Sequence, residues 1–165
     1  MTGSTDRDAL RNETPAERYD RNWIEVLQEL RVLQTGTQIL TGFLLALAFQ
    51  PAFLDLAEGQ RIFYLVLVVL SALSAVIALA PVALHRILFR EGAKGTIVAY
   101  GHASLQSALV IVSLLLVGVV AFIFDVVVSD TASWIAAIVL AVFVVVLWLI
   151  VPFFLRSRRN RRGES

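Results

Sequence analysis

The stretch Ile62–Leu84, IFYLVLVVLSALSAVIALAPVAL, decides the fold of this chain. It carries no charge, and as a helix with a rise of about 1.5 Å per residue it is long enough to cross a bilayer core about 30 Å thick. Three further apolar runs lie at Leu30–Phe49, Ala103–Phe124 and Ser133–Leu155, and only the first of these contains a charged residue. The sequence therefore predicts an all-α fold, a four-span transmembrane helical bundle.

The composition agrees with a membrane protein and leaves no room for a second folded domain. Hydrophobic residues make up 58% of the chain, and the mean hydropathy is +0.79, which is too apolar for a soluble domain of this length. We predict a disordered cytoplasmic tail over residues 1–13, a single four-helix membrane domain over residues 14–155 and a basic cytoplasmic tail over residues 156–165. The first 29 residues are polar and charged, so we expect no cleavable signal peptide. Cysteine is absent, which excludes disulfides, thiolate metal sites and a lipidated cysteine anchor.

The basic residues are distributed very unevenly between the two sides of the predicted bundle. Four precede the first run and Arg31 lies at its inner end, three lie between the second and third runs, and five follow the fourth, whereas the other two loops contain only Arg61. The positive-inside rule then places both termini and the middle loop in the cytoplasm. The opposite side receives the acidic residues Asp55, Glu58, Asp125 and Asp130.

A helix is predicted to begin ahead of the first run. Thr14-Pro15-Ala16-Glu17 has the pattern of a capping box with proline at the first helical position. Opposite charges then alternate every four residues on one face, at Glu17, Arg21 and Glu25. The other face presents an apolar stripe of Tyr19, Trp23, Val26, Leu27, Leu30 and Leu33. We expect an amphipathic cytoplasmic helix that lies on the inner membrane surface or packs on the cytoplasmic ends of the other spans.

The first run is too short to span a membrane by its charge-free part alone. Gly36–Phe49 has 14 residues, which as a helix cover about 21 Å. The span must take its inner end from Leu30–Thr35, and this brings Arg31, Gln34 and Gln38 toward membrane depth, where polar groups need partners. They either snorkel to the interface or form a polar network between helices for packing or for a ligand.

The best candidate site is a cluster of polar side chains at the predicted cytoplasmic face. Glu29 is expected to pair with Arg86 or Arg90. One interpretation is that the cluster locks the helices together and fixes the topology, and the other is that it forms a ligand or proton site. Its members are Glu25, Glu29, Arg31, Gln34, Gln38, His85, Arg86, Arg90, His102 and Gln106.

The motifs of enzymes, metal sites and nucleic-acid sites are missing from the sequence. It has no nucleophile motif, no paired intramembrane aspartates and no H-E-x-x-H, and its two histidines lie seventeen residues apart. We expect no enzymatic activity, cofactor, metal or nucleic-acid partner. The basic tail abuts the last span without interleaved aromatic residues, which favours a topological anchor that can touch anionic lipid. Its arginines are Arg156, Arg158, Arg159, Arg161 and Arg162.

Several short segments of the chain form a recognisable set: Glu29-Leu30-Arg31, Gln34-Thr35-Gly36, Gln38-Ile39-Leu40, Gln60-Arg61, Pro81-Val82-Ala83 with His85-Arg86, and Leu88-Phe89-Arg90. Together they resemble a family of small bacterial four-span membrane proteins whose domain is of unknown function. The resemblance covers roughly residues 22–126 and implies the fold and a bacterial membrane location, but no activity and no site. Some members carry an automatic sodium:proton antiporter label.

The sequence is compatible with two functions. We expect a multi-pass protein of the bacterial cytoplasmic membrane with a non-enzymatic structural or accessory role, whose partners are membrane lipids and either a second copy of the chain or another membrane protein. The alternative is a cation/proton antiporter-like transporter that acts as an oligomer. Such exchange normally needs a carboxylate near the bilayer middle, and none of the four spans contains one; the only candidate carriers are Glu29 at the inner edge and Asp125 at the outer edge.

Overall fold

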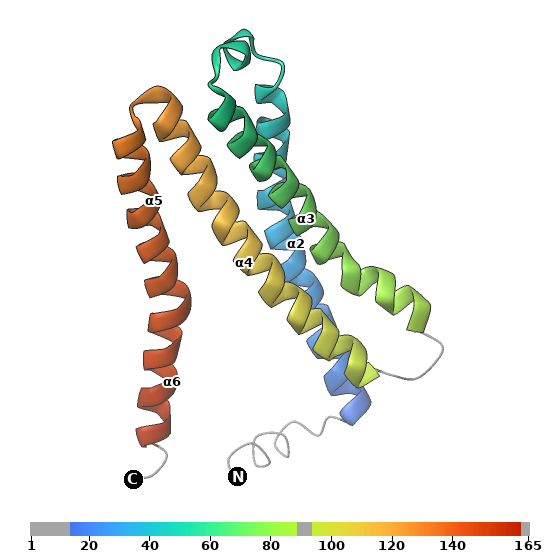
Figure 1. Ribbon diagram of the computed structural model, residues 1–165. Helices are drawn as coiled ribbons and strands as arrows, with labels where there is room; N and C mark the ends of the chain where they lie inside the picture. The colour runs from blue at the N-terminus through green and yellow to red at the C-terminus, as the bar shows by residue number, and fades with distance from the viewer. Residues whose placement is uncertain (1–13, 89–93, 163–165) are drawn as a thin grey trace. The chain divides into compact units, whose positions relative to one another are not determined.

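The computed structural model describes residues 14–88 and 94–162, and these residues contain helices and no strand (Figure 1). Helix α2 contains the first apolar run up to Leu47, α3 contains the second and α4 the third, and the fourth is divided among α5, η2 and α6. A 3-10 helix, η1, precedes α3, and a π-helical turn, η2, joins α5 to α6. The bounds are α2 Pro15–Leu47, η1 Pro51–Asp55, α3 Glu58–Leu88, α4 Lys94–Val127, α5 Asp130–Val145, η2 Val146–Ile150 and α6 Val151–Arg162.

Four helical segments are long and apolar enough to cross a membrane, as the sequence predicts. They are Glu17–Leu47, Glu58–Leu84, Val98–Val127 and Asp130–Ser157. The first has a mean hydropathy of 1.2, whereas the other three reach 2.8 to 3.2. The predicted all-α fold with four candidate spans is confirmed, and the first span is the most polar one.

Helix α2 begins where the capping box predicts. The backbone N–H of Glu17 donates to Thr14 Oγ1 at 3.3 Å, and the Glu17 carboxylate accepts from the N–H and the hydroxyl of Thr14, both at 2.8 Å. These reciprocal bonds satisfy amide groups that the first helical turn leaves without partners. The helix then runs without a break to Leu47, so the leading segment and the first span form one element.

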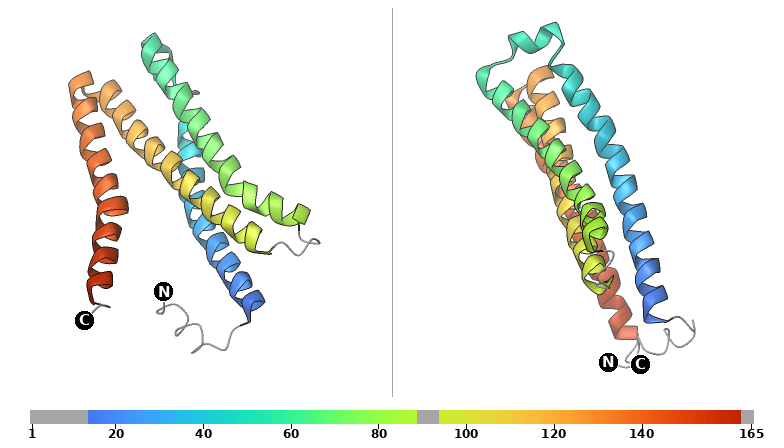
Figure 2. Two further views of the ribbon diagram at one scale, coloured as in Figure 1. Left: turned by 60° about the horizontal axis from the view of Figure 1, so that its bottom comes forward. Right: turned by 90° about the vertical axis from the view of Figure 1, so that its right-hand side faces the viewer.

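Short turns reverse the chain after α2 and after α4. Gln50-Pro51 follows the end of α2 and opens η1, which forms the turn between α2 and α3 in Figure 2. Between α4 and α5 the chain turns within two residues, and Ser129 caps α5 by accepting from the N–H of Ala132 at 3.2 Å. A connection this short places α4 and α5 as antiparallel neighbours.

The chain divides into two compact units. The described parts of the first are residues 14–42, 72–88 and 94–110. Its core joins Val26 and Leu30 of α2 to Ala78 of α3 and Leu105 of α4. A Cβ atom added at Gly101 would lie 3.1 Å from Cγ1 of Val26, so the absence of a side chain there lets α2 and α4 approach closely.

The second unit comprises residues 43–71 and 111–162 of the described chain. Leu44, Tyr64, Leu67 and Leu115 are among its buried residues. A Cβ atom added at Gly118 would lie only 2.5 Å from Cδ2 of Leu67, so α3 and α4 pack here through a glycine. The hydroxyl of Tyr64 donates to the backbone oxygen of Leu44 at 2.7 Å and ties α3 to α2.

The two prolines inside helices have different effects on the backbone. Pro81 is fully buried inside α3, which continues to Leu88 and changes direction in its light-green part, as a proline kink predicts (Figures 1 and 2). Pro152 instead follows the π turn η2, in which the N–H of Val151 donates to the oxygen of Val146. Proline has no N–H and its ring clashes with the carbonyl four residues earlier, so the helix accommodates Pro152 by widening one turn.

Candidate functional site

The structure places the predicted cytoplasmic cluster mainly on the outside of the helices. Gln34 is half-buried, whereas Arg90 and the side chain of His85 lie outside the described residues. The other members are exposed: Glu25, Glu29, Arg31, Gln38, Arg86, His102 and Gln106. Gln38 and Gln106, two glutamines within the predicted spans, are therefore open to the surroundings of the chain.

Only one member of the cluster has an ion pair that the structure resolves among the described residues. Glu25 accepts from Arg21 at 3.1 Å, one turn away on the same helix. Within the described part of the chain, no ion pair joins Glu29 to Arg86, and neither Gln38 nor Gln106 has a side-chain hydrogen bond. The described side chains thus do not close into a polar network inside one copy of the protein.

Helix periodicity explains why Gln38 points outward. The buried face of α2 in the first unit carries Val26, Leu30 and Thr37, spaced by four and seven residues. The hydroxyl of Thr37 donates to the backbone oxygen of Leu33 at 2.9 Å, so the buried hydroxyl is satisfied inside the helix. Gln38 follows Thr37 and is turned away from this face by about 100°, because a helix has about 3.6 residues per turn.

Helix α4 shows the same arrangement in the first unit. Val98, Leu105 and Ala108 are buried, and the backbone at Gly101 lies against α2. Residues three and four apart share a helix face, which places His102 and Gln106 together on the exposed side. Helices α2 and α4 therefore each present a polar outer face near the end of the candidate span that the sequence assigns to the cytoplasm.

A second polar group, which the sequence analysis does not list as a site, lies in the second unit. The side-chain oxygen of Gln60 accepts from the N–H of Ala57 at 3.1 Å, and its amide nitrogen donates to Oδ2 of Asp125 at 2.9 Å. Arg61 donates to the backbone oxygen of Leu54. Gln60 thereby ties the start of α3 to the end of α4, and both Gln60 and Asp125 are half-buried.

The sequence contains a signal for this link. Asp125 directly follows the third apolar run, and a carboxylate there needs a hydrogen-bond donor at the same depth. The predicted topology places Gln60, just before the second run, on the same side of the membrane. This unit contains a second bond between helices: the hydroxyl of Ser133 in α5 donates to the backbone oxygen of Ala121 in α4 at 2.8 Å. The sequence does not predict this bond, because a serine at a span end more often bonds within its own helix.

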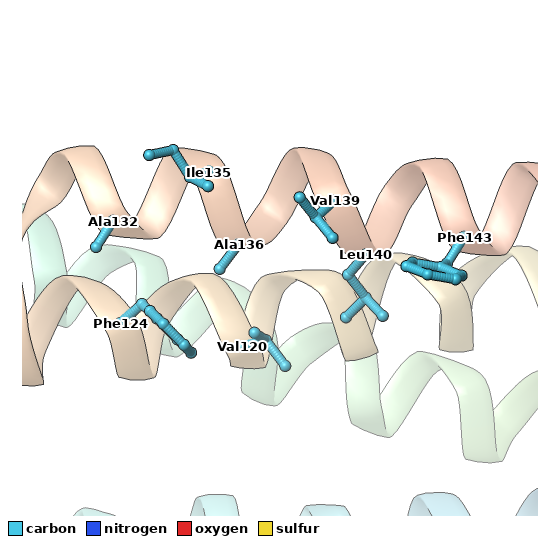
Figure 3. Close-up of a pocket in the computed structure, with 8 residues that line it drawn as sticks. All are labelled: Val120, Phe124, Ala132, Ile135, Ala136, Val139, Leu140 and Phe143. Atoms are coloured by element: carbon cyan, nitrogen blue, oxygen red, sulfur yellow. The ribbon is translucent and has the colours of Figure 1, made fainter.

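An apolar pocket of about 560 Å³ lies between α4 and α5 in the second unit (Figure 3). Val120 and Phe124 line it from α4, and residues of α5 line it from the other side. Small side chains at Ala132 and Ala136 leave the space between the helices open. Its lining offers apolar contact and no group for acid–base or metal chemistry. The lining residues of α5 are Ala132, Ile135, Ala136, Val139, Leu140 and Phe143.

The remaining predicted site is the basic tail. Arg156 is exposed, and the side chains of the other four arginines lie outside the described residues. Among the described residues, no three His, Cys, Asp or Glu residues gather as metal ligands.

Comparison with known proteins places the chain in a family. Neither the curated proteins nor the solved structures contain a match to the chain. A family model does match it over residues 12–152 and is described as a family of unknown function, DUF6328. The match covers far more than half of the chain and bears out the resemblance to a family of unknown function. The chain belongs to the DUF6328 family.

Proposed function

We propose that the chain is a structural or accessory component of a bacterial cytoplasmic membrane that binds other transmembrane helices and has no enzymatic activity. The single observation that carries this proposal is the exposure of Gln38 and Gln106 on helices apolar enough to span a membrane. Polar groups at membrane depth need hydrogen-bond partners, and the described residues of the same chain supply none for these two side chains.

The depth of Gln38 strengthens the argument. It lies nine residues before Leu47, the last residue of α2, which corresponds to about 14 Å along the helix, or nearly half of a bilayer core about 30 Å thick. Arg31 lies seven residues further inward, so its long side chain reaches the interface, whereas the shorter Gln38 does not. A partner helix satisfies an amide at this depth better than lipid does.

The charge pattern supports the orientation. Thirteen of the fourteen basic residues lie on the side of the predicted spans that holds the two termini and the connection between α3 and α4, so both termini are cytoplasmic in this proposal. The exposed polar faces of α2 and α4 then belong to the inner leaflet. In the same orientation, the hydrogen bond between Gln60 and Asp125 joins α3 to α4 at their outer ends.

Photocrosslinking and ion flux together test the proposed function. A benzophenone side chain is placed at position 38 or 106, with Ile138 as the control, because Ile138 is also exposed but lies in a wholly apolar part of α5. We expect protein adducts from positions 38 and 106 and only lipid adducts from position 138. Purified chain in phosphatidylethanolamine–phosphatidylglycerol vesicles should give no sodium-driven change in internal pH.

The opposite result would favour the antiporter. Reproducible sodium-driven proton flux, lost in Asp125→Asn or Glu29→Gln while the helical content is unchanged, would reject the structural role. Lipid adducts alone at positions 38 and 106 would also reject it, because the exposed amides would then have no protein partner.

A further inference from the structure

The outer face of α2 carries a second seam in addition to the one that packs inside the chain. Its residues alternate in spacing between four and three, which is the repeat of helices that pair side by side in a left-handed coil. All of them are exposed, and all belong to the first compact unit. We name this set the outer seam: Ile24, Gln28, Arg31, Thr35, Gln38 and Gly42.

The chemistry of the outer seam suits a helix of the same kind. The amide of Gln38 is both a donor and an acceptor, so two such amides can bond to each other reciprocally. The hydroxyl of Thr35 already donates to the backbone oxygen of Arg31 at 2.9 Å and needs no outside partner. A Cβ atom added at Gly42 would meet no atom within 4 Å, so the backbone there is open to close approach by another helix.

From this, and resting on the proposed function, we infer that the occupant of the outer seam is the outer seam of a second copy of the chain. All copies enter the membrane in one orientation and place Gln38 at one depth. A two-fold axis along the membrane normal therefore brings Gln38 opposite Gln38 of the second copy, without any adjustment in register. A different membrane protein would need a matching amide at the same depth, whereas a second copy supplies it by symmetry.

Arg31 sets a limit on this association. The same symmetry brings the two Arg31 side chains near each other, and like charges at one level of a helix pair repel. Arg31 lies seven residues inward of Gln38, about 10 Å along the helix, where lipid phosphates can neutralise it in part. The Gln38 amides thus stabilise the dimer and the Arg31 guanidinium groups destabilise it. Removing Gln38 should therefore weaken self-association, and removing the charge of Arg31 should strengthen it.

The absence of native cysteine gives a direct test in the full chain. Gly42→Cys and Gly36→Cys form a matched pair, since both glycines are exposed in α2 and neither would bring a Cβ atom within 4 Å of its surroundings. Gly42 lies on the outer seam and Gly36 does not. In phosphatidylethanolamine–phosphatidylglycerol vesicles treated with an oxidant, we expect a disulfide-linked dimer from Gly42→Cys and at least about tenfold slower linkage from Gly36→Cys.

Energy transfer between labelled copies measures the role of each polar residue. Gln38→Leu should weaken self-association by about tenfold, in line with the strength of hydrogen bonds between transmembrane helices, and Gln38→Asn should retain most of it. Arg31→Gln should strengthen it. Thermal unfolding of each variant in detergent checks that the fold is intact.

Equal linkage at positions 36 and 42, or an unchanged association in Gln38→Leu, would overturn the inference. Other results would test the proposed accessory function separately from the inferred dimer. A photoadduct from position 38 with a mass other than twice that of the chain would reject the second copy and keep the accessory role, whereas sodium-driven proton flux would reject the accessory role itself.

Discussion

Gly118 and Gly36 show how differently a glycine can act within one helical chain. A Cβ atom at Gly118 would lie 2.5 Å from Cδ2 of the buried Leu67, whereas one at Gly36 would meet nothing within 4 Å. We expect Gly118→Ala to lower stability by about 1–3 kcal/mol through overpacking. Gly36→Ala should be neutral or stabilise by up to about 1 kcal/mol through helix propensity. Thermal unfolding in detergent compares them, and equal midpoints would contradict the close packing of α3 and α4.

Two glutamines provide a matched test of which polar groups hold one chain together. Gln60→Leu removes the bonds to Ala57 and Asp125 and should destabilise the fold by about 1–3 kcal/mol, because a half-buried carboxylate loses its donor. Gln38→Leu removes an exposed side chain and should leave the stability of the single chain unchanged. The comparison is made by thermal unfolding in detergent at a dilution where the chain is monomeric. A larger loss in Gln38→Leu would show that Gln38 is bonded within its own chain.

At the scale of single helices, the start of α2 depends on one side chain. Thr14 accepts from the N–H of Glu17 and donates to its carboxylate, so Thr14→Ala should cost about 0.5–2 kcal/mol of local helix stability. The change should appear as faster hydrogen exchange of the Glu17 and Arg18 amides. Thr14→Ser keeps the hydroxyl and serves as the control. Unchanged exchange in Thr14→Ala would mean that packing alone fixes this helix end.

The sequence predicts helices better than it predicts their faces. The four spans and the start of α2 follow from hydropathy and from the capping box, which are local signals. The outward direction of Gln38 does not follow from hydropathy, because exposed positions near it, such as Ile39 and Phe43, are as apolar as buried ones. In a bilayer the outside of a helix is apolar as well, so the periodicity that marks the core of a soluble protein is lost.

The hydrogen bond between Gln60 and Asp125 and the two prolines inside helices also depend on packing that the sequence does not reveal. Gln60 and Asp125 are 65 residues apart, and their bond depends on how two helices are aligned along their length. Pro81 and Pro152 have similar local sequences, yet only Pro152 follows a π turn. Pro81 is fully buried and Pro152 is exposed, and burial of this kind depends on the packing of other helices rather than on neighbouring residues.

For the whole molecule, the uneven distribution of basic residues predicts the topology. A reporter that is active only in the cytoplasm should be active when fused after Ser165 and silent when inserted in Val127–Thr131. The physical reason is that thirteen basic residues resist transfer across the membrane on one side, against one on the other. The reverse pattern of activity would invert the orientation and move the polar cluster to the outer leaflet.

The unbroken length of α2 has a mechanical consequence. Its 33 residues extend over about 50 Å, well beyond a membrane core of about 30 Å. Gln38 lies 23 residues after Pro15 in this unbroken helix, which makes the segment before it an arm of about 35 Å. A tilt of about 10° at Gln38 would carry the far end of such an arm through about 6 Å. Val26 and Leu30 of this arm pack against Ala78 of α3 and Leu105 of α4, so such a tilt either carries the neighbouring helices of the first unit with it or breaks these contacts.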